Sequence, residues 1–438
     1  MDSTDTIFAL SSGAPPAAIG VIRISGPRAL EAAGAVTTAP MPEPRQARFR
    51  RIVDPETREV LDECVLVWFP AAASETGEDT VELQGHGSRA AIRGIEAALG
   101  RLPGVRLAEP GEFTRRAFLN GKTDLAKIEG LADLIHAETA PQRRAAMAMM
   151  GGALSRKIAE WAQRLMSISA RVEAVLNFSD EGDVDEAAVR AGVTEEIMVI
   201  AAELAADLAR PGAERLRDGV RVVIAGPPNA GKSTLLNALA GRDAAIVSPI
   251  AGTTRDVIEV PVALGGIPFL LADTAGLREP GADEIEAIGM DRAHAMLAAA
   301  DIVLWLGHGE ELPYVPGALM MVHAKADLRM VPNHSGPFAA AALVVSAVTG
   351  EGMDALVAAL LGAAERLLPQ PGDYALSVRQ RAAMARARDE LARGAKQTDD
   401  ILIAESLRSA LAALDEITGR STTEAVLDEL FSGFCIGK

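Results

Sequence analysis

The stretch Gly226-Pro-Pro-Asn-Ala-Gly-Lys-Ser233 decides the fold of the region around it. It fits the pattern G-x-x-x-x-G-K-[S/T], follows an apolar run over 220–225 and precedes a helix-like run over 234–240. A strand, a glycine-bounded loop and a helix N-terminus in that order form a cradle for phosphate, because backbone N–H groups and the helix dipole favour an anion. In this pattern Lys232 reaches the β and γ phosphate oxygens and Ser233 holds Mg²⁺. The sequence therefore predicts a nucleoside triphosphate site in a doubly wound α/β domain.

Two segments downstream indicate hydrolysis of that nucleotide. Ala251-Gly-Thr-Thr-Arg-Asp256 supplies a threonine that can complete the Mg²⁺ shell, and the apolar run Phe269-Leu-Leu-Ala-Asp-Thr-Ala-Gly276 ends in D-T-A-G. An aspartate there can orient a metal-bound water, and the glycine N–H can sense the γ-phosphate. The next residue is Leu277, where signalling GTPases place the glutamine that orients the attacking water. Water positioning and charge neutralisation must therefore come from elsewhere, with Arg255 and Arg278 as nearby candidates.

The choice of base depends on Ala324-Lys-Ala-Asp327, where GTPases usually carry N-K-x-D. The Asp327 carboxylate can accept two hydrogen bonds from guanine, and Lys325 can lie across the base. Val345-Ser-Ala347 is a second candidate base loop. Because Ala324 removes one contact to the base, we expect GTP to bind with weakened affinity. An ATP-dependent metabolic enzyme stays the alternative if this substitution changes the base choice.

Composition and charge limit the class of protein. The chain has 438 residues, a net charge of −17 and two cysteines, Cys64 and Cys435. It contains no long uncharged apolar run and begins with an acidic segment, so we expect a cytoplasmic protein without a membrane contact or a secretory signal. A protein that binds RNA tightly by itself is usually basic, so an RNA role would need a local basic patch or a partner that carries the RNA. The candidate patch is Arg379, Arg381, Arg386, Arg388, Arg393 and Lys396, although a solvated helix face is the commoner explanation.

The chain divides by pattern into α/β and helical regions. Strand-like runs over 19–24, 63–69 and 80–84 and a helix-like run over 88–100 predict an N-terminal α/β domain over 1–120. Alanine-rich periodic runs over 125–148, 154–176, 187–208, 379–394 and 399–414 predict helices. We therefore predict a helical bundle domain in two parts, 121–216 and 369–438, with a P-loop GTPase domain over 217–368 inserted between them.

Motifs outside the nucleotide region carry a family resemblance. They are Gly20-Val-Ile-Arg-Ile-Ser-Gly-Pro27, Thr76-Gly-Glu-Asp79, Glu82-Leu-Gln-Gly-His-Gly87, Leu107-Ala-Glu-Pro-Gly-Glu-Phe-Thr-Arg-Arg-Ala-Phe-Leu-Asn-Gly-Lys122 and the terminal Phe434-Cys-Ile-Gly-Lys438. With them the chain resembles, over nearly its whole length, the tRNA modification GTPases of the MnmE (TrmE) family. The P-loop motif is shared by many unrelated proteins, whereas this N-terminal block combined with F-C-I-G-K is highly specific.

The resemblance implies a potassium-stimulated GTPase of tRNA modification. It implies an N-terminal domain that binds folate and forms a homodimer, and a flavin-dependent partner, MnmG (GidA), in a heterotetramer. Together they would add an aminomethyl or carboxymethylaminomethyl group at C5 of the wobble uridine, position 34 of tRNA. The one-carbon unit would come from a tetrahydrofolate derivative, the 5,10-methylene or the 5-formyl form. A partner that contacts the RNA is compatible with the acidic charge of this chain.

The resemblance also implies the site residues. Asn229, with the segment at Ser248, Ile250 and Thr253, would hold K⁺, and Ser233 and Thr254 would hold Mg²⁺. Glu286, Asp273 and Lys232 would be catalytic. The positions implied for folate are Arg23, Glu82, Lys122 and Lys438. The implied GTP or GDP contacts are Asn229, Ala230, Gly231, Lys232, Ser233, Thr234, Ser248, Pro249, Ile250, Ala251, Gly252, Thr253, Thr254, Asp273, Thr274, Ala275, Gly276, Lys325, Asp327, Ser346 and Ala347.

Some features depart from the family pattern or leave alternatives open. Ser11-Ser-Gly-Ala-Pro-Pro16 replaces a more glycine-rich segment, which puts the folate contacts of that segment in doubt. His86 between two glycines is expected to be a structural loop residue, and Cys435 is as well explained by packing as by reactivity. A GTP-switched ribosome-assembly factor would have similar nucleotide motifs. Such a switch would have no use for the N-terminal block or for F-C-I-G-K.

Overall fold

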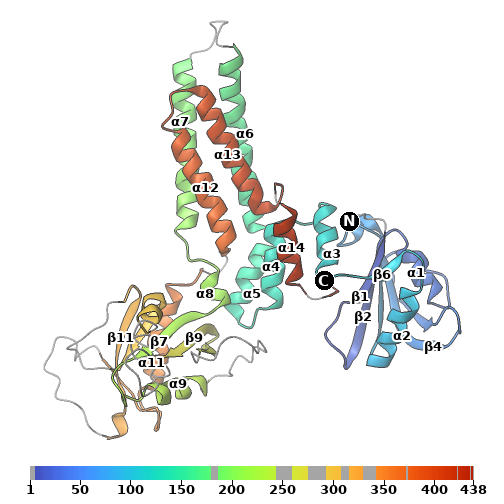
Figure 1. Ribbon diagram of the computed structural model, residues 1–438, viewed down its shortest axis with the longest axis horizontal. Coiled ribbons are helices and arrows are strands. Elements are labelled where there is room, and N and C mark those ends of the chain that lie inside the picture. Colours follow the sequence, from blue (N-terminus) through green and yellow to red (C-terminus); the bar gives the residue numbers. More distant parts are fainter. Residues whose placement is uncertain are drawn as a thin grey trace, which may run out of the picture. The chain divides into compact units, whose positions relative to one another are not determined.

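The protein folds into two compact units, which the computed structural model describes over most of the chain (Figure 1). The first unit comprises Met1–Ile128 and Thr418–Lys438, and the second comprises Glu129–Ile417. The structure describes residues 5–178, 186–242, 259–274, 293–306, 315–328, 342–370, 373–421, 423–434 and 436–437. The division into four domains by sequence stays a prediction. The two compact units group residues 418–438 with the N-terminal segment.

A six-stranded sheet forms the centre of the first unit. Its strands are β1 (Thr6–Leu10), β2 (Ala17–Ser25), β3 (Arg48–Val53), β4 (Val60–Phe69), β5 (Thr80–Gly87) and β6 (Val105–Leu107). They lie in the order β3-β4-β5-β2-β1-β6. All neighbours pair antiparallel except β1 and β6, which are parallel. The three strands predicted from sequence are β2, β4 and β5. The prediction missed β1, β3 and β6, of which β6 has only three residues and β3 is mostly polar and exposed.

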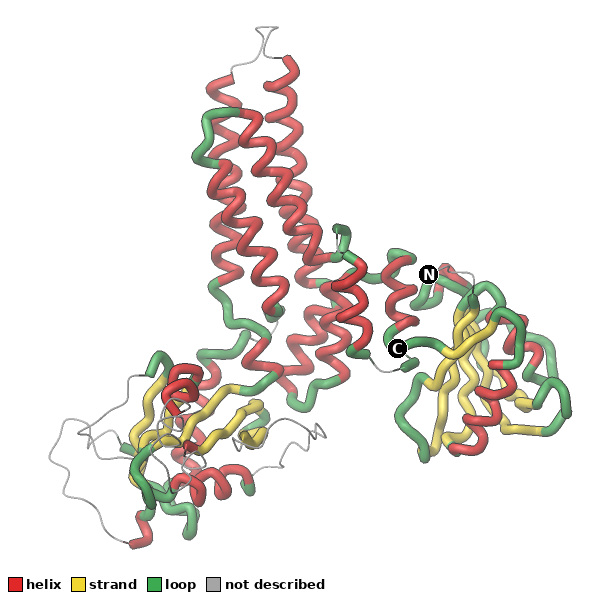
Figure 2. Tube along the Cα trace, in the orientation of Figure 1, coloured by secondary structure: helices red, strands yellow, loops and turns green. Residues whose placement is uncertain are grey.

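Two helices cover one face of this sheet. They are α1 (Ala29–Ala35) and α2 (Arg89–Gly100), and Figure 2 shows them beside the strands. Residues that alternate along a strand point to opposite faces, so Ile22 and Ile24 of β2 enter the core with Leu83 of β5. Arg23, between the two isoleucines, therefore points to the other face. The first unit also contains α3 (Glu112–Leu119) and α14 (Glu424–Ser432), which pack against each other.

Long helices form a bundle in the second unit. They are α6 (Ala153–Phe178), α7 (Glu186–Leu208), α12 (Val378–Gly394) and α13 (Asp400–Thr418), and Figure 1 shows them side by side. The largest fully buried side chain is that of Trp161, whose Nε1 donates to Glu203 Oε2 at 2.7 Å. These helices agree with the predicted runs.

One predicted helix is wrong. The run over 125–148 is divided into α4 (Leu125–Ile135) and α5 (Ala140–Met150). Thr139 caps α5 in a capping box with Gln142, and Pro141 lies in its first turn. These are start signals for a new helix, so the local sequence favours a break at this point over a continuous helix.

The second unit also holds a six-stranded sheet of the doubly wound type. Its strands are β7 (Val220–Ala225), β8 (Glu259–Leu264), β9 (Ile267–Asp273), β10 (Ile302–Trp305), β11 (Ala318–His323) and β12 (Leu343–Val344). The order is β12-β11-β10-β7-β9-β8, and only β8 runs antiparallel to its neighbour. The sheet packs with α8 (Glu214–Arg217), α9 (Lys232–Ala240) and α11 (Met353–Glu365) around one apolar core. The predicted doubly wound sheet is confirmed.

Candidate functional site

The phosphate loop connects β7 directly to α9. Gly226 and Gly231 have φ of 148° and 97°, and Gly231 is the residue immediately before α9. A side chain is strained at these angles, so the turn requires glycine at both positions. The Lys232 ammonium is buried and donates to Gly226 O at 3.1 Å and Pro227 O at 3.0 Å. The loop thus curls around the lysine amine, which lies where the phosphates of a nucleotide would meet it.

Ser233 and Asp273 lie together beside this loop. The Ser233 hydroxyl donates to Asp273 Oδ2 at 2.5 Å. Asp273 ends β9, whose register places it opposite Ile224 of β7, and the Thr274 hydroxyl donates to Ile224 O at 3.2 Å. Hydroxyl and carboxylate oxygens suit Mg²⁺, which keeps few protein ligands and relies on substrate phosphates. Among the described residues there is no group of three or more His, Cys, Asp or Glu side chains that could hold a metal ion.

The two loops predicted to bind the base are hydrogen-bonded to each other. The Ser346 hydroxyl is buried and donates to Asp327 Oδ1 at 2.6 Å, and Ala326 N donates to Val345 O at 3.0 Å. The first loop also reaches the phosphate loop, because Lys325 Nζ donates to Asn229 O at 2.6 Å. The structure therefore brings Asn229, Lys325, Asp327 and Ser346 into one region at the ends of parallel strands, where doubly wound folds bind ligands.

Ala324 lies beside the phosphate loop. A Cβ at Gly231 would lie 3.7 Å from the Ala324 Cβ and 3.6 Å from Lys325 Cε. An asparagine at position 324 would add an amide at this place. The Lys325 to Asn229 hydrogen bond joins the same two loops without that amide.

Several predicted site residues lie outside the described residues. They are Ser248, Pro249, Ile250, Ala251, Gly252, Thr253, Thr254, Ala275, Gly276, Glu286 and Lys438. Leu277, Arg255, Arg278 and Cys435 lie outside them as well. The potassium segment, the second magnesium ligand and the glutamate implied for catalysis therefore stay predictions.

Arg23 and Glu82 form an ion pair on the face of the first unit's sheet that α1 and α2 leave uncovered. They are register partners on β2 and β5, and Arg23 Nε and Nη2 donate to Glu82 Oε1 at 3.2 and 2.9 Å. Gln84, two residues along the same face, donates to Glu82 Oε2 at 3.2 Å. The guanidinium also lies 5.9 Å from the centre of the buried Phe113 ring, a distance at which a cation is attracted by the ring.

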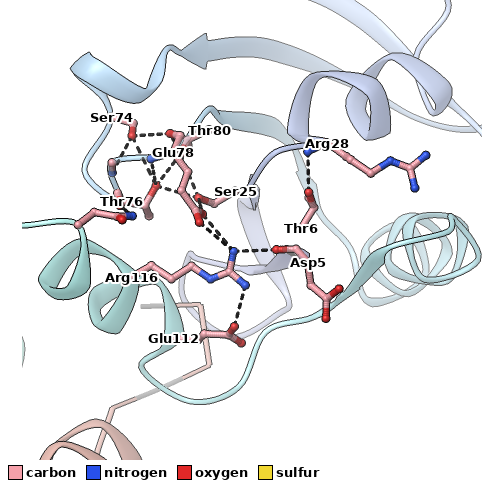
Figure 3. A network of polar contacts seen from close by, with 12 residues as sticks. Asp5, Thr6, Ser25, Arg28, Ser74, Thr76, Glu78, Thr80, Glu112 and Arg116 are labelled. Atoms are coloured by element: carbon pink, nitrogen blue, oxygen red, sulfur yellow. Dashed lines mark hydrogen bonds and ion pairs between the residues drawn. The ribbon is translucent and has the colours of Figure 1, made fainter. Parts of the chain in front are cut away.

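A buried polar network holds the loop next to this pair (Figure 3). Arg116 is buried and donates to Glu78, Glu112 and the Asp5 carbonyl oxygen at 2.8–3.2 Å. Glu78 accepts from the Ser25 hydroxyl at 2.9 Å. Buried charges are costly unless they are paired and hydrogen-bonded, and this arginine has both kinds of partner. The network therefore fixes the loop over 74–80 against β2 and α3.

The segment over 72–75 contacts both Lys122 and Arg23. Lys122 Nζ donates to Ala72 O at 2.9 Å, and Glu75 Oε2 lies 3.6 Å from Arg23 Nη1. Two cations, Arg23 and Lys122, and two carboxylates, Glu75 and Glu82, thus lie around residues 72–82. This set fits a reduced folate, since a carboxylate can pair with the donor edge of a pterin and cations suit a glutamate tail.

The C-terminal segment approaches this region. Ile436 forms a β-bridge with Pro110, and a Cβ at Gly437 would lie 2.1 Å from Leu10 O. Leu10 follows Ala9, the register partner of Arg23. The residue that precedes Lys438 is therefore packed one strand position away from the level of Arg23.

His86 lies on strand β5, not in the loop expected from its flanking glycines. Its Nδ1 lies 2.7 Å from Asp62 Oδ1, and its backbone N donates to Asp62 Oδ2 at 2.8 Å. A Cβ at Gly85 would lie 2.5 Å from Asp62 Oδ2, so this glycine leaves room for the carboxylate. The hydrogen bond to Asp62 raises the pKa of His86. The imidazole is exposed while its partner carboxylate is buried.

Sequence reasoning missed three supporting residues: Gln84, Phe113 and Asp62. Only Gln84 had a local signal, because it shares a strand face with Glu82. Four of the six cations of the candidate basic patch are paired with carboxylates: Arg379 with Glu129, Arg386 with Glu416, Arg388 with Asp389 and Arg393 with Glu390. Arg381 donates to backbone oxygens of Leu208 and Arg210, and Lys396 lies beyond the end of α12. This supports the commoner explanation of a solvated helix face.

None of the helices in the described part of the chain is long and apolar enough to cross a membrane.

Comparison with known proteins adds two family matches. Residues 6–122 match the family described as GTP-binding protein TrmE N-terminus, and residues 125–435 match the MnmE helical domain.

Full-length relatives agree with these matches. The tRNA modification GTPase MnmE of Rhizorhabdus wittichii is 55% identical over 100% of this chain and 97% of its own length. That of Erythrobacter litoralis is 55% identical over 99% and 100%. Among solved structures, the G domain of the T. maritima FeoB iron transporter is 23% identical, covers 33% of this chain and 98% of its own and has a TM-score of 0.24, at which a likeness carries no inference about function. The two family matches and the full-length relatives establish that this chain belongs to the tRNA modification GTPases of the MnmE family.

Proposed function

We propose that this GTPase is stimulated by potassium and acts with a flavin-dependent partner, MnmG (GidA), on the wobble uridine at position 34 of tRNA. The product would carry an aminomethyl or carboxymethylaminomethyl group at C5, with the carbon supplied by a tetrahydrofolate derivative. The observation that carries the proposal is that one chain of this family contains two separate candidate sites. One is a phosphate loop with Lys232, Ser233 and Asp273 assembled. The other is the Arg23 and Glu82 pair with Lys122 at the same loop.

In the nucleotide site the residues of the chain have distinct tasks. Lys232 supplies a fixed positive charge toward the β and γ phosphates, and the loop N–H groups surround them. Ser233 and Asp273 present oxygens on the side where Mg²⁺ would bind, and Mg²⁺ would neutralise charge that develops during hydrolysis. Thr254 and Glu286 are proposed to complete the magnesium shell and to orient the water. Asp327, oriented by Ser346, selects guanine.

Potassium would take the place of an arginine finger beside the phosphates. Asn229 supports this assignment: its φ is 60°, its carbonyl accepts from Lys325, and its side chain is exposed at the loop. An amide oxygen from such a side chain is a ligand that a potassium ion accepts. Ser248, Ile250 and Thr253 are proposed as the remaining ligands.

The test compares GTP hydrolysis by the full-length protein in KCl and in NaCl at equal ionic strength, with Asn229→Ala as the variant. We expect faster hydrolysis in KCl and loss of this difference in the variant. Equal rates in both salts for the wild-type protein would refute potassium activation and make Arg255 and Arg278 the charge donors to examine.

The folate site is tested separately by calorimetric titration with 5-formyltetrahydrofolate. Glu82→Gln removes the charge that is proposed to pair with the pterin edge, and we expect binding to weaken at least tenfold, the loss of a charge-assisted pair. Arg93→Gln on α2, on the covered face of the sheet, is the matched control. Equal binding of 5-formyltetrahydrofolate by the Glu82 variant and the wild type would contradict a folate site on this face of the sheet.

A homodimer is proposed through the part of this sheet face that β3, β4 and β5 form. Phe49 and Val65 are register partners, Val65 pairs in turn with Gln84, and both apolar side chains are exposed. Exposed apolar side chains that gather beside a polar site are typical of an interaction surface. Phe49→Glu is expected to convert the dimer to a monomer in light scattering, and an unchanged mass would place the dimer contact elsewhere.

A further inference from the structure

A cleft of about 700 Å³ opens within the second unit, between helix α5 and the GTPase sheet. Pro141 and Arg144 of α5 line one side, Gly265 and Gly266 of the β8–β9 turn line another, and Arg366 and Pro369 at the end of α11 complete it. None of the roles assigned above involves this cleft.

The walls of the cleft are held together by specific contacts. Gln142 of α5 donates its Nε2 to Leu216 O at 2.7 Å, and Arg217 donates to Asp133 at 2.6 and 2.9 Å. Ala145 packs against the apolar core of the GTPase sheet. Because these contacts involve backbone, charge and apolar packing at once, the cleft is part of the folded unit.

The arginines that line the cleft make no ion pair within the described part of the protein. Arg144 and Arg366 are exposed, and neither side chain has a hydrogen bond or ion pair with any residue in the described ranges. Arg143, next to Arg144, is exposed in the same way. Among the described residues that line the cleft, Glu365 is the single carboxylate. In a chain with a net charge of −17, where the arginines of α12 are all engaged, Arg144 and Arg366 give the cleft a local excess of positive charge over Glu365.

We propose that this cleft binds the phosphate backbone of tRNA, an inference that rests on the membership of the chain in a tRNA-modifying family. Guanidinium groups without a protein partner are well suited to phosphate, which they can bind through two parallel hydrogen bonds. The described residues that line the cleft include no aromatic side chain, so this part of the cleft offers charge without a surface on which bases could stack. Contacts of this kind position an RNA and do not read its sequence.

The position of the cleft links the RNA to both parts of the second unit. An RNA bound there contacts α5 and the β8–β9 turn at the same time. Strand β9 begins at Ile267, which lines the cleft, and ends at Asp273, beside Ser233. The RNA contact and the magnesium end of the nucleotide site therefore occupy opposite ends of one strand.

The experiment measures tRNA binding by the full-length protein with fluorescence anisotropy over a range of KCl concentrations. The test variant is Arg144→Ala/Arg366→Ala. The control variant, Arg386→Ala/Arg388→Ala, removes the same charge from arginines that are paired on α12. Each lost phosphate contact lowers the slope of log K against log salt by roughly 0.9, so we expect a reduction of about 2 for the test variant and little change for the control.

The alternatives give different results. Equal slopes for the two variants would overturn the proposal, because only total charge would then matter. An unchanged slope together with lost binding of an acidic protein partner would overturn it in favour of a protein surface. Arg144→Lys/Arg366→Lys keeps the charges and should retain the salt slope. A reduced slope in this lysine variant would therefore also overturn the proposal. The assay needs no folate, flavoprotein or GTP hydrolysis, so its failure is distinguishable from failure of the proposed chemistry.

Discussion

From the hydrogen bond between Ser346 and Asp327 we predict how strongly the buried Ser346 hydroxyl influences guanine binding. Ser346 is completely buried, and its Oγ donates to Asp327 Oδ1 at 2.6 Å. The Ser346 Oγ also accepts a hydrogen bond from Thr349 N at 3.1 Å. Ser346→Ala removes both bonds without a change in volume that the core would feel. A hydrogen bond to a charged group contributes about 1.5–3 kcal/mol. Asp327 is exposed, so water replaces part of the lost bond and the lower value applies.

About 1.5 kcal/mol corresponds to a roughly tenfold weaker affinity for GDP. The measurement is a titration with a fluorescent GDP analogue, alongside thermal unfolding. Thr349→Ala is the matched control: among the described residues the Thr349 hydroxyl accepts only from Glu351 N in the same turn, so GDP affinity should stay within about twofold. If Ser346→Ala lowers the melting temperature but leaves GDP affinity unchanged, Ser346 does not orient a base-binding carboxylate, and the assignment of Asp327 fails.

Three further predictions concern buried or paired groups. The pKa of His86, measured by NMR, should lie above its ordinary value of about 6.5 and return toward that value in Asp62→Asn. Because the pKa of His86 is raised in the folded state, its pair with Asp62 stabilises the fold at acidic pH. This contribution to stability disappears as the pH rises through the folded-state pKa. Burial raises the pKa of Cys64 to about 12, so its thiol should resist alkylation at pH 8 in the native protein and react only on unfolding; rapid native labelling at this position would contradict the burial. Tyr374→Phe removes the buried donor to Asp207 at 2.5 Å and should lower the free energy of unfolding by about 1.5–3 kcal/mol in urea titrations, whereas unchanged stability would show that the carboxylate has other partners sufficient to hold it.

The parts of the fold that could be predicted from the sequence have short-range causes. The phosphate loop has glycines where the backbone needs a positive φ, so β7 and α9 follow from local chemistry. The break between α4 and α5 had an equally local cause in Thr139 and Gln142, but the apolar periodicity over 125–148 concealed it. Local signals therefore suffice where they are read together with the hydrophobic pattern.

The arrangement of the candidate sites has long-range causes that a single sequence does not display. Arg23 and Glu82 are opposite each other only because β2 and β5 pair in one register, although they are far apart in the chain. The residues of this site came from the family resemblance and not from any local pattern. The arginines of α12 illustrate the converse, because their carboxylate partners on other segments decide whether they are available. Pairing of this kind is visible only in three dimensions.

The packing of the last residues of the chain against the N-terminal unit has a consequence for synthesis. Ile436 pairs with Pro110, and Gly437 packs against Leu10, so the first unit acquires these contacts only after the second unit has been made. On a ribosome, roughly 300 residues separate the two parts of the first unit, a delay of about 15–60 s at about 5–20 residues per second. A nascent chain would therefore lack the backbone contacts of Pro110 and Leu10 throughout this interval, and a chain released early would never form them. Ribosome-bound intermediates should show this as protease sensitivity near Pro110 that falls once Ile436 and Gly437 have joined the first unit.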